Sequence, residues 1–253
     1  MNNNNISIVT IAYKNVEELS ETLISIDNQV AKPFENILIL SGFDNNEKNK
    51  ITKEFTRSYR EFYWDIDSSL FNAMNKGIEK STGSFILFMN AGDVFSSPES
   101  LKLADSNIRD KKCYSFKTLQ VYDNISIVRE NVPKKGFFGL GLEKNLPPHQ
   151  GFFAPNEKKI FFNELLKVSA DNDWMNKNIN KYDIYYSRDI IAKFKLGGQS
   201  TYPTLNIIYI KLRYEKFIRF IIECLKYIYS FFVSKKLYFI TMAKLRNYKI
   251  IKE

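Results

Sequence analysis

Residues 85–93 read FILFMNAGD, an almost unbroken apolar run that ends in a short polar cluster with a carboxylate at Asp93. Such a run predicts a strand buried on both faces of a parallel sheet. Ligands of open α/β sheets bind beyond the carboxyl ends of these strands, where the strand order reverses. We therefore expect Asp93 at the ligand-binding edge of a sheet, although a lone Asp after a strand is also a common turn or helix cap.

The rest of the first 130 residues alternates between strand and helix patterns. Strands are predicted at 6–13, 36–40, 61–64, 84–89, 113–119 and 125–130, and helices at 16–29, 47–59 and 70–80, the last capped by Ser68 or Ser69. Residues 136–141 read as a loop rich in Gly and Phe. This order predicts a doubly wound α/β domain with a mostly parallel, mixed sheet.

Whole-chain composition limits the class of protein. The 253 residues are 44% hydrophobic, enough to bury a full core. Cys113 and Cys224 match no metal or redox spacing, which favours a reducing compartment. The start, MNNNNISIVTIAY, lacks the basic region of a secretory signal, so we expect a polar tail followed by a first strand.

The net charge of +9 is concentrated in the last 49 residues, which hold 11 Lys and Arg against 3 Glu, while the first 204 hold 26 basic and 25 acidic residues. Residues 204–253 have the pattern of a basic amphipathic helical tail, and their longest uncharged run, 227–234, is far below the roughly 20 residues of a spanning helix. The tail could pack on the domain or on a second subunit, as in a homo-oligomer, or lie on an anionic cytoplasmic membrane surface. Its broad Ile, Phe and Tyr face argues against nucleic acid as a partner.

No glycine-rich phosphate loop of the GxGxxG or GxxxxGK[ST] type occurs in the sequence. A bound phosphate would need another counter-charge. Mg²⁺ or Mn²⁺ held by Asp93 would supply it, since these ions combine one or two protein carboxylates with substrate phosphates.

Five segments taken together resemble bacterial family-2 glycosyltransferases of the GT-A fold, over roughly residues 5–201. They are SIVTIAYKNVEELSETLISIDNQ, DSSLFNAMNKGIEKSTGSFILFMNAGDVF, PHQGFFAP, SADNDWMNK and IAKFKLGGQS. The likeness is closest to the branch that builds capsule, exopolysaccharide or O-antigen (lipopolysaccharide) units. It implies a catalytic domain over residues 1–203 and a metal-dependent, inverting hexosyl- or N-acetylhexosaminyltransferase. The implied donor is a nucleotide-sugar, foremost a UDP-sugar, the acceptor a glycan or polyprenyl-diphosphate-linked sugar, and the location the inner face of the plasma membrane.

The resemblance also implies roles for individual residues. Asp93 matches the last carboxylate of the metal-binding Asp-x-Asp signature, which reaches the donor diphosphate through Mn²⁺ or Mg²⁺, while Asn90 and Gly92 stand where other members carry aspartates. Asp171 matches the general base that takes the acceptor proton; by its position alone it, or Asp173, could instead cap a helix.

The remaining matches concern the donor and the mouth of the site. Ala12 and Tyr13 match the turn that flanks the nucleotide base, Asp67 an acidic residue near the donor sugar or ribose, and Asn75 and Lys76 donor-pocket positions that could equally be an exposed helix turn. His149 and Gln150 match a His-Gln pair at the site mouth, although a lone histidine is more often structural; Asp44 either contacts the base or ribose or caps its turn. Asn72 and Ser69 replace the usual Asp and Gly, which leaves donor preference open.

Two other classes are consistent with parts of this pattern. A sugar-phosphate nucleotidyltransferase would share the fold, but its first loop should be rich in Gly, Arg and Lys, and TIAYKNVEEL is not. A non-catalytic membrane-surface assembly partner would have lost the base or the metal carboxylate, whereas Asp171 and Asp93 are both present.

Overall fold

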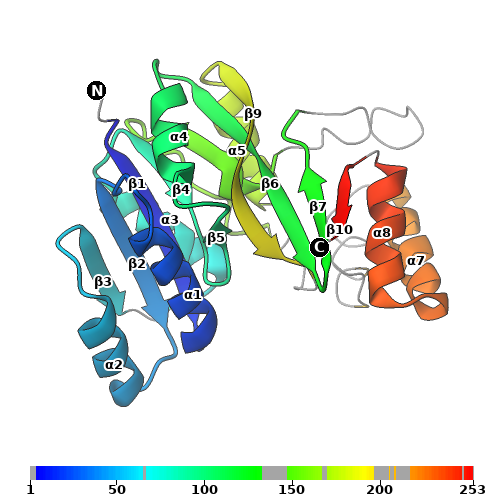
Figure 1. Ribbon diagram of the computed structural model, residues 1–253, viewed down its shortest axis with the longest axis horizontal. Coiled ribbons are helices and arrows are strands. Elements are labelled where there is room, and N and C mark those ends of the chain that lie inside the picture. The colour runs from blue at the N-terminus through cyan, green and yellow to red at the C-terminus, as the bar shows by residue number, and fades with distance from the viewer. Residues whose placement is uncertain are drawn as a thin grey trace.

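The computed structural model of the chain describes residues 4–64, 67–132, 147–166, 170–196, 205, 208, 217–246 and 248–252 (Figure 1). Its main sheet has the strand order β10-β7-β6-β8-β4-β1-β2-β3. The strands are β1 (Ile6–Tyr13), β2 (Glu35–Ser41), β3 (Arg60–Trp64), β4 (Phe85–Phe88), β5 (Val94–Phe95), β6 (Cys113–Tyr122), β7 (Ile125–Arg129), β8 (Phe152–Pro155), β9 (Ile184–Lys195) and β10 (Ile250–Lys252). The helices are α1 (Val16–Asp27), α2 (Asn45–Phe55), α3 (Leu70–Lys80), α4 (Ser100–Asn107), the 3₁₀ turn η2 (His149–Gly151), α5 (Ala170–Ile179), α7 (Phe217–Phe232) and α8 (Lys235–Leu245).

The sheet is parallel at one end and antiparallel at the other. β1 pairs in parallel with both β2 and β4, and β2 with β3. From β4 onward the pairs β4–β8, β8–β6, β6–β7 and β7–β10 are antiparallel, while β9 runs parallel to β6 and antiparallel to β5. The chain therefore starts from β1 and winds outward to both sides, which confirms the mixed, doubly wound sheet predicted from the sequence.

Two helical layers cover the parallel part, and the alternation of residues along β1 shows why. Ile6, Ile8 and Ala12 face a core shared with α1, α2 and α4, while Val9 and Ile11 face a second core shared with α3 and α5 (Figure 1). A strand with an apolar layer on each face needs a largely apolar sequence. β4 (FILF) is apolar throughout, and β1 (ISIVTIAY) is apolar except for the buried Ser7 and Thr10.

Helix boundaries follow from their caps. α3 begins at Leu70 as predicted, because the Ser69 hydroxyl accepts from the Asn72 N–H at 3.1 Å. α2 begins two residues earlier than the predicted 47–59, because Asp44 and Glu47 form a capping box. Of the turn and helix-cap roles considered for Asp93, the cap is wrong, because Val94–Phe95 form β5 and α4 starts only at Ser100. The turn is present, since the Asp93 N–H donates to the Asn90 carbonyl at 2.9 Å.

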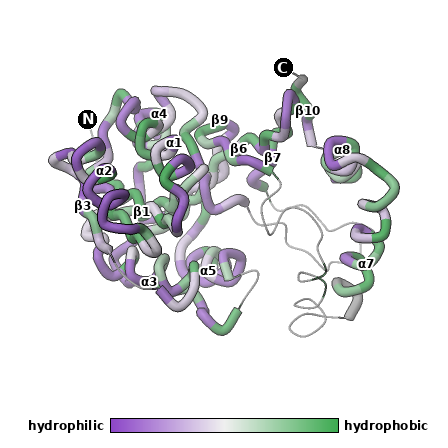
Figure 2. Tube along the Cα trace, turned by 90° about the horizontal axis from the view of Figure 1, so that it is seen from below, coloured by the Kyte–Doolittle hydropathy of each residue, from purple (hydrophilic) through white to green (hydrophobic). Residues whose placement is uncertain are grey.

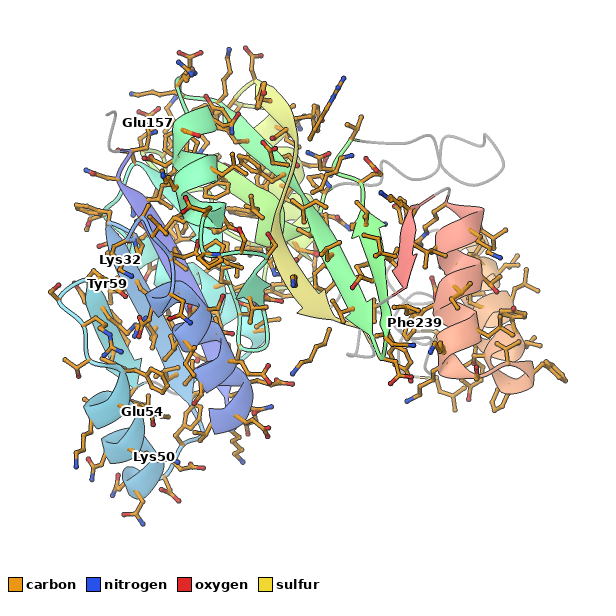
Figure 3. The ribbon with its side chains drawn as sticks, viewed as in Figure 1. Lys32, Lys50, Glu54, Tyr59, Glu157 and Phe239 are labelled. Carbon is orange, nitrogen blue, oxygen red and sulfur yellow. The ribbon has the colours of Figure 1, made fainter. Side chains whose placement is uncertain are left out.

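The C-terminal segment is built into the sheet. Strand β10 adds to the edge of β7, and Tyr238 and Phe239 of α8 pack against Ile125 and Ile127 of that strand. Figure 3 shows Phe239 on the side of α8 that faces the sheet, where its ring centroid lies 4.9 Å from that of Tyr122. The predicted loop 136–141, and most of residues 197–216, lie outside the described residues.

Candidate functional site

The turn after β4 is held against α1 by its backbone. This turn comprises Asn90 to Asp93. The Ala91 N–H donates to the Ile11 carbonyl of β1 at 3.0 Å, and beyond this bond the chain leaves the sheet. The Gly92 N–H then donates to the Thr22 hydroxyl at 2.9 Å and to the Glu18 carbonyl at 3.1 Å, and Gly92 has φ +90°, a conformation that favours glycine. The turn therefore lies fixed at the carboxyl ends of β1 and β4, the edge predicted from the sequence.

Asp93 is buried at this edge with only 7% of its surface exposed. Its Oδ1 accepts from the Gln150 side-chain amide at 3.1 Å, and its Oδ2 accepts from the Asn90 N–H at 3.0 Å. Burial raises the pKa of Asp93 to about 7; these two hydrogen bonds oppose the rise, and the negative charge of Glu18 adds to it. The carboxylate thus sits where its own ionisation is costly, and a nearby cation would relieve that cost.

His149 approaches Asp93 from η2. Its Nε2 is 3.9 Å from Asp93 Oδ2 and 3.5 Å from the Asn90 side-chain nitrogen. Burial lowers the pKa of His149, and the negative charge of Asp171 opposes this shift. The imidazole is therefore mainly neutral at pH 7 and can hydrogen-bond without contributing positive charge.

Asp171 belongs to the same neighbourhood, because its charge acts on His149. It is half-buried in the first turn of α5, where its Oδ1 accepts from the Asn172 N–H at 2.8 Å. Asp173 lies in the same turn and pairs with Lys177 at 2.7 Å. Neither precedes α5, so the alternative of an N-cap role is wrong for both, although carboxylates in a first turn still favour the helix dipole.

The ends of β1 and β2 form a second part of this edge. Tyr13 is 65% exposed, Ala12 beside it is buried, and the Lys14 ammonium lies 5.1 Å from the Tyr13 ring centroid. Gly42 has φ +78°, and a Cβ there would come within 2.8 Å of the Tyr13 ring. Asp44 caps α2, accepting from the Glu47 N–H at 2.9 Å, so the capping alternative holds for this residue.

Three predicted donor-pocket residues have partners within the fold. Asp67 forms an ion pair with Lys76 at 2.9 Å. Asn75 holds the Phe162 backbone with both ends of its amide, donating to the carbonyl at 3.1 Å and accepting from the N–H at 2.8 Å, and also donates to Glu164 at 2.8 Å. In this structure Asn75 attaches the 160–166 loop to α3.

Tertiary packing brings Asn90, Asp93, His149, Gln150 and Asp171 together, and adds two residues that the sequence analysis missed. Thr22 is fully buried and holds the turn, and a Cβ on Gly92 would lie 3.5 Å from the Glu18 carboxyl carbon. Their only local signal is a pair of polar residues four apart on α1, flanked by buried Leu19 and Leu23.

The oxygen atoms of Asp93 and Asn90 could ligate a divalent cation that also binds phosphate. Asp93 supplies a carboxylate, and Asn90 Oδ1 is buried without a hydrogen-bond partner among the described residues. Within the described ranges, no three His, Cys, Asp or Glu side chains gather closely enough to hold a metal ion by themselves. A hard cation with few protein ligands suits Mg²⁺ or Mn²⁺, whose remaining positions are filled by phosphate oxygens and water.

The sequence is similar to those of known glycosyltransferases. The family model described as Glycosyl transferase family 2 matches residues 7–169. An uncharacterized glycosyltransferase of Methanocaldococcus jannaschii, MJ1057, is 23% identical over 211 residues, which cover 78% of this chain and 72% of the relative.

The fold of this chain is similar to that of solved glycosyltransferase structures. S. aureus TarS 1–349 in complex with UDP-GlcNAc superposes with a TM-score of 0.60 at 17% identity, over 78% of this chain and 60% of that one. The mannosyltransferase PcManGT from Pyrobaculum calidifontis, in complex with GDP-Man and Mn²⁺, gives 0.56 at 11% identity, over 78% and 58%. The chain thus spans about 60% of these structures' length. With the sheet order described above, they confirm the GT-A-like α/β fold.

Proposed function

The chain belongs to glycosyl transferase family 2, and we propose that it moves one sugar from a nucleotide-diphosphate donor to a hydroxyl of a lipid-linked or oligosaccharide acceptor, with inversion. The observation that carries this proposal is the buried carboxylate of Asp93 at the carboxyl ends of β1 and β4, with His149 and Gln150 brought to it by η2. That edge is where α/β sheets of this topology bind nucleotides.

The donor would lie along the ends of β1, β2 and β4. Tyr13 is exposed there as a flat ring for a nucleobase, and Gly42 leaves room for that ring, because a Cβ on Gly42 would lie 2.8 Å from it. A divalent cation held by Asp93 and Asn90 would neutralise the leaving diphosphate. Neutral His149 would donate a hydrogen bond from its ring N–H to an oxygen of the same phosphates. Complexes of similar folds with UDP-GlcNAc, and with GDP-Man and Mn²⁺, support a nucleotide-sugar donor and a divalent ion.

Asp171 would act on the acceptor side. As the acceptor oxygen attacks the anomeric carbon, its proton passes to the Asp171 carboxylate and the bond from that carbon to the diphosphate oxygen breaks. Attack opposite the leaving group inverts the anomeric configuration. The role needs an ionised carboxylate within hydrogen-bond reach of the hydroxyl, and the first turn of α5 holds one beside the His149 site.

We further propose a hexose or N-acetylhexosamine as the transferred sugar, a UDP-sugar as the first donor to test, and bacterial capsule, exopolysaccharide or lipopolysaccharide assembly as the pathway. The support is the joint sequence pattern of residues 5–201, which resembles that branch. In this proposal residues 1–203 carry the catalysis, and the enzyme works in the cytoplasm at the inner face of the plasma membrane.

The test is a panel of nucleotide-sugars with and without Mn²⁺, read as donor cleavage and, by calorimetry, as donor binding. We expect metal-dependent cleavage of one donor by the parent, loss of metal-linked binding in Asp93→Ala, and retained binding with lost turnover in Asp171→Asn. Asp123→Asn is the matched control, because that carboxylate is exposed in the β6–β7 turn. Absence of both cleavage and metal-linked nucleotide binding would favour the non-catalytic assembly partner instead.

A further inference from the structure

Helix α7 exposes its apolar side. Ile221, Leu225, Ile228 and Phe232 are 40%, 61%, 54% and 81% exposed, and Phe231 beside them is 70% exposed. The first four are spaced by four, three and four residues, so they form one narrow stripe along the helix. Figure 2 shows this hydrophobic colouring along α7 at the end of the molecule away from β3 and α2. We call these five residues the α7 stripe.

The charged pair described on α7 lies on the more covered side of the helix. Glu223 and Lys226 pair at 2.7 Å with side chains only 15% and 20% exposed. A helix on the surface of a soluble domain normally shows the opposite arrangement, with charges outward and apolar residues inward. The α7 stripe is therefore an exposed apolar surface, turned away from the charged pair of the same helix.

The stripe is not needed to attach α7 to the fold. The Tyr229 hydroxyl lies 3.0 Å from the Thr241 hydroxyl of α8, and Tyr229 and Val233 pack on the cluster that joins α8 to β7. Helix α8 is fixed in turn by buried Tyr238 and Phe239 and by β10, which pairs with β7. The helix thus has a firm base on one side and presents the stripe on another.

The net charge of the C-terminal segment favours one occupant of the stripe. The last 49 residues carry 11 Lys and Arg against 3 Glu, and the stripe ends next to exposed Lys235. Two copies joined through this segment would bring two strongly positive surfaces together, which like-charge repulsion disfavours. An anionic lipid surface attracts each basic residue and accepts exposed Leu, Ile and Phe side chains among its headgroups.

We propose that the α7 stripe binds the chain to an anionic membrane surface, with the helix axis in the plane of the headgroups. Within the described ranges, no helix has the length and hydrophobicity needed to cross a bilayer. The inference goes beyond the proposed transfer activity, because binding to vesicles can be measured without donor or acceptor. Membrane binding and catalysis can therefore fail separately.

The test is flotation of the full chain with vesicles of phosphatidylcholine alone and of phosphatidylcholine with phosphatidylglycerol. We expect co-flotation with the anionic vesicles that weakens at raised salt. In Leu225→Ser/Ile228→Ser/Phe232→Ser we expect at least about a tenfold loss of partitioning, because three side chains no longer transfer apolar surface from water. Ile24→Ser/Val30→Ser is the matched control, since both residues are exposed apolar side chains elsewhere, at 48% and 56%.

Three results would overturn the proposal: a parent chain that stays with the soluble fraction, a triple variant that floats like the parent, or equal binding to neutral and anionic vesicles. A parent dimer in solution that the triple variant abolishes would assign the stripe to a second copy instead. Circular dichroism of both variants checks that they fold, as expected for substitutions at exposed positions.

Discussion

Replacing Asp93 by Asn should stabilise the folded protein at alkaline pH while removing the metal-linked nucleotide binding that we propose. The pKa of Asp93 rises from 3.8 to about 7 in the folded state, chiefly through burial. Between these two values the folded chain holds a proton that the unfolded chain has released, so the free energy of unfolding falls as pH rises through this window. The cost of the buried charge is fully present above about pH 7.

The magnitude follows from that shift. A rise of roughly three pKa units corresponds to about 4 kcal/mol. An Asn side chain can keep the hydrogen bond from Gln150, but its amide nitrogen cannot accept from the Asn90 N–H, which costs about 1 kcal/mol. We therefore expect Asp93→Asn to raise the free energy of unfolding by about 3 kcal/mol at about pH 8, and by about 1 kcal/mol or less at about pH 5.

Urea unfolding at both pH values measures this directly, with Asp123→Asn as the control for loss of a surface carboxylate. Added Mn²⁺ with a nucleoside diphosphate should stabilise the parent and not Asp93→Asn, because only a ligand bound to the folded state raises its stability. A change in the free energy of unfolding that is the same at both pH values would refute the reasoning, since it would mean that the carboxylate ionises in the folded protein as it does in water.

Three further perturbations test contacts that hold the fold together. Gly77→Ala should destabilise by about 1–3 kcal/mol, because its Cβ would lie 2.3 Å from Val9 Cγ1, and Val9→Ala should recover part of the loss in thermal melting. Burial raises the pKa of Glu35, but four hydrogen bonds outweigh it and leave the pKa below 4.5; the stability this gives is present above that value and lost as pH falls through the folded pKa. Glu35→Gln should therefore be destabilising at neutral pH and close to neutral in acid, and an equal loss in both would contradict the assignment. Asp27→Ala should cost about 3 kcal/mol in urea unfolding, because it leaves the buried Arg60 guanidinium without its carboxylate at 2.8 Å; an unchanged midpoint would show that the remaining partners suffice.

Local signals were enough for the parallel half of the fold. The strand at 6–13 and the helix at 70–80 have the predicted bounds, because continuous apolar sequence and the Ser69 cap act within a few residues of where they are read. The capping box at Asp44 is equally local, and capping is one of the two roles that the sequence predicts for that residue. A helix-cap role for Asp93 is wrong because the chain continues into β5, which pairs with β9 almost a hundred residues later, and no local pattern specifies that pairing.

In the candidate site, too, the sequence indicated individual residues but not the contacts between them. The sequence pointed to Asp93, His149, Gln150 and Asp171 one by one, through the end of an apolar run and a resemblance of motifs. It did not indicate that Gln150 donates to Asp93, that Thr22 holds the turn, or that Asn75 is committed to the Phe162 backbone. Each of these contacts joins residues more than 50 positions apart, so it exists only after the sheet has assembled.

The sequence by itself therefore determined the bounds of β1 and α3, the cap at Asp44, the edge where a ligand would lie, and the concentration of positive charge near the C-terminus. Tertiary structure alone decided the burial that raises the pKa of Asp93, the pairing of β10 with β7, and the outward direction of the α7 stripe. The physical reason is the distance along the chain over which each kind of interaction acts. Propensity, capping and periodicity depend on neighbours along the chain, whereas desolvation and exposure depend on which distant elements pack together in space.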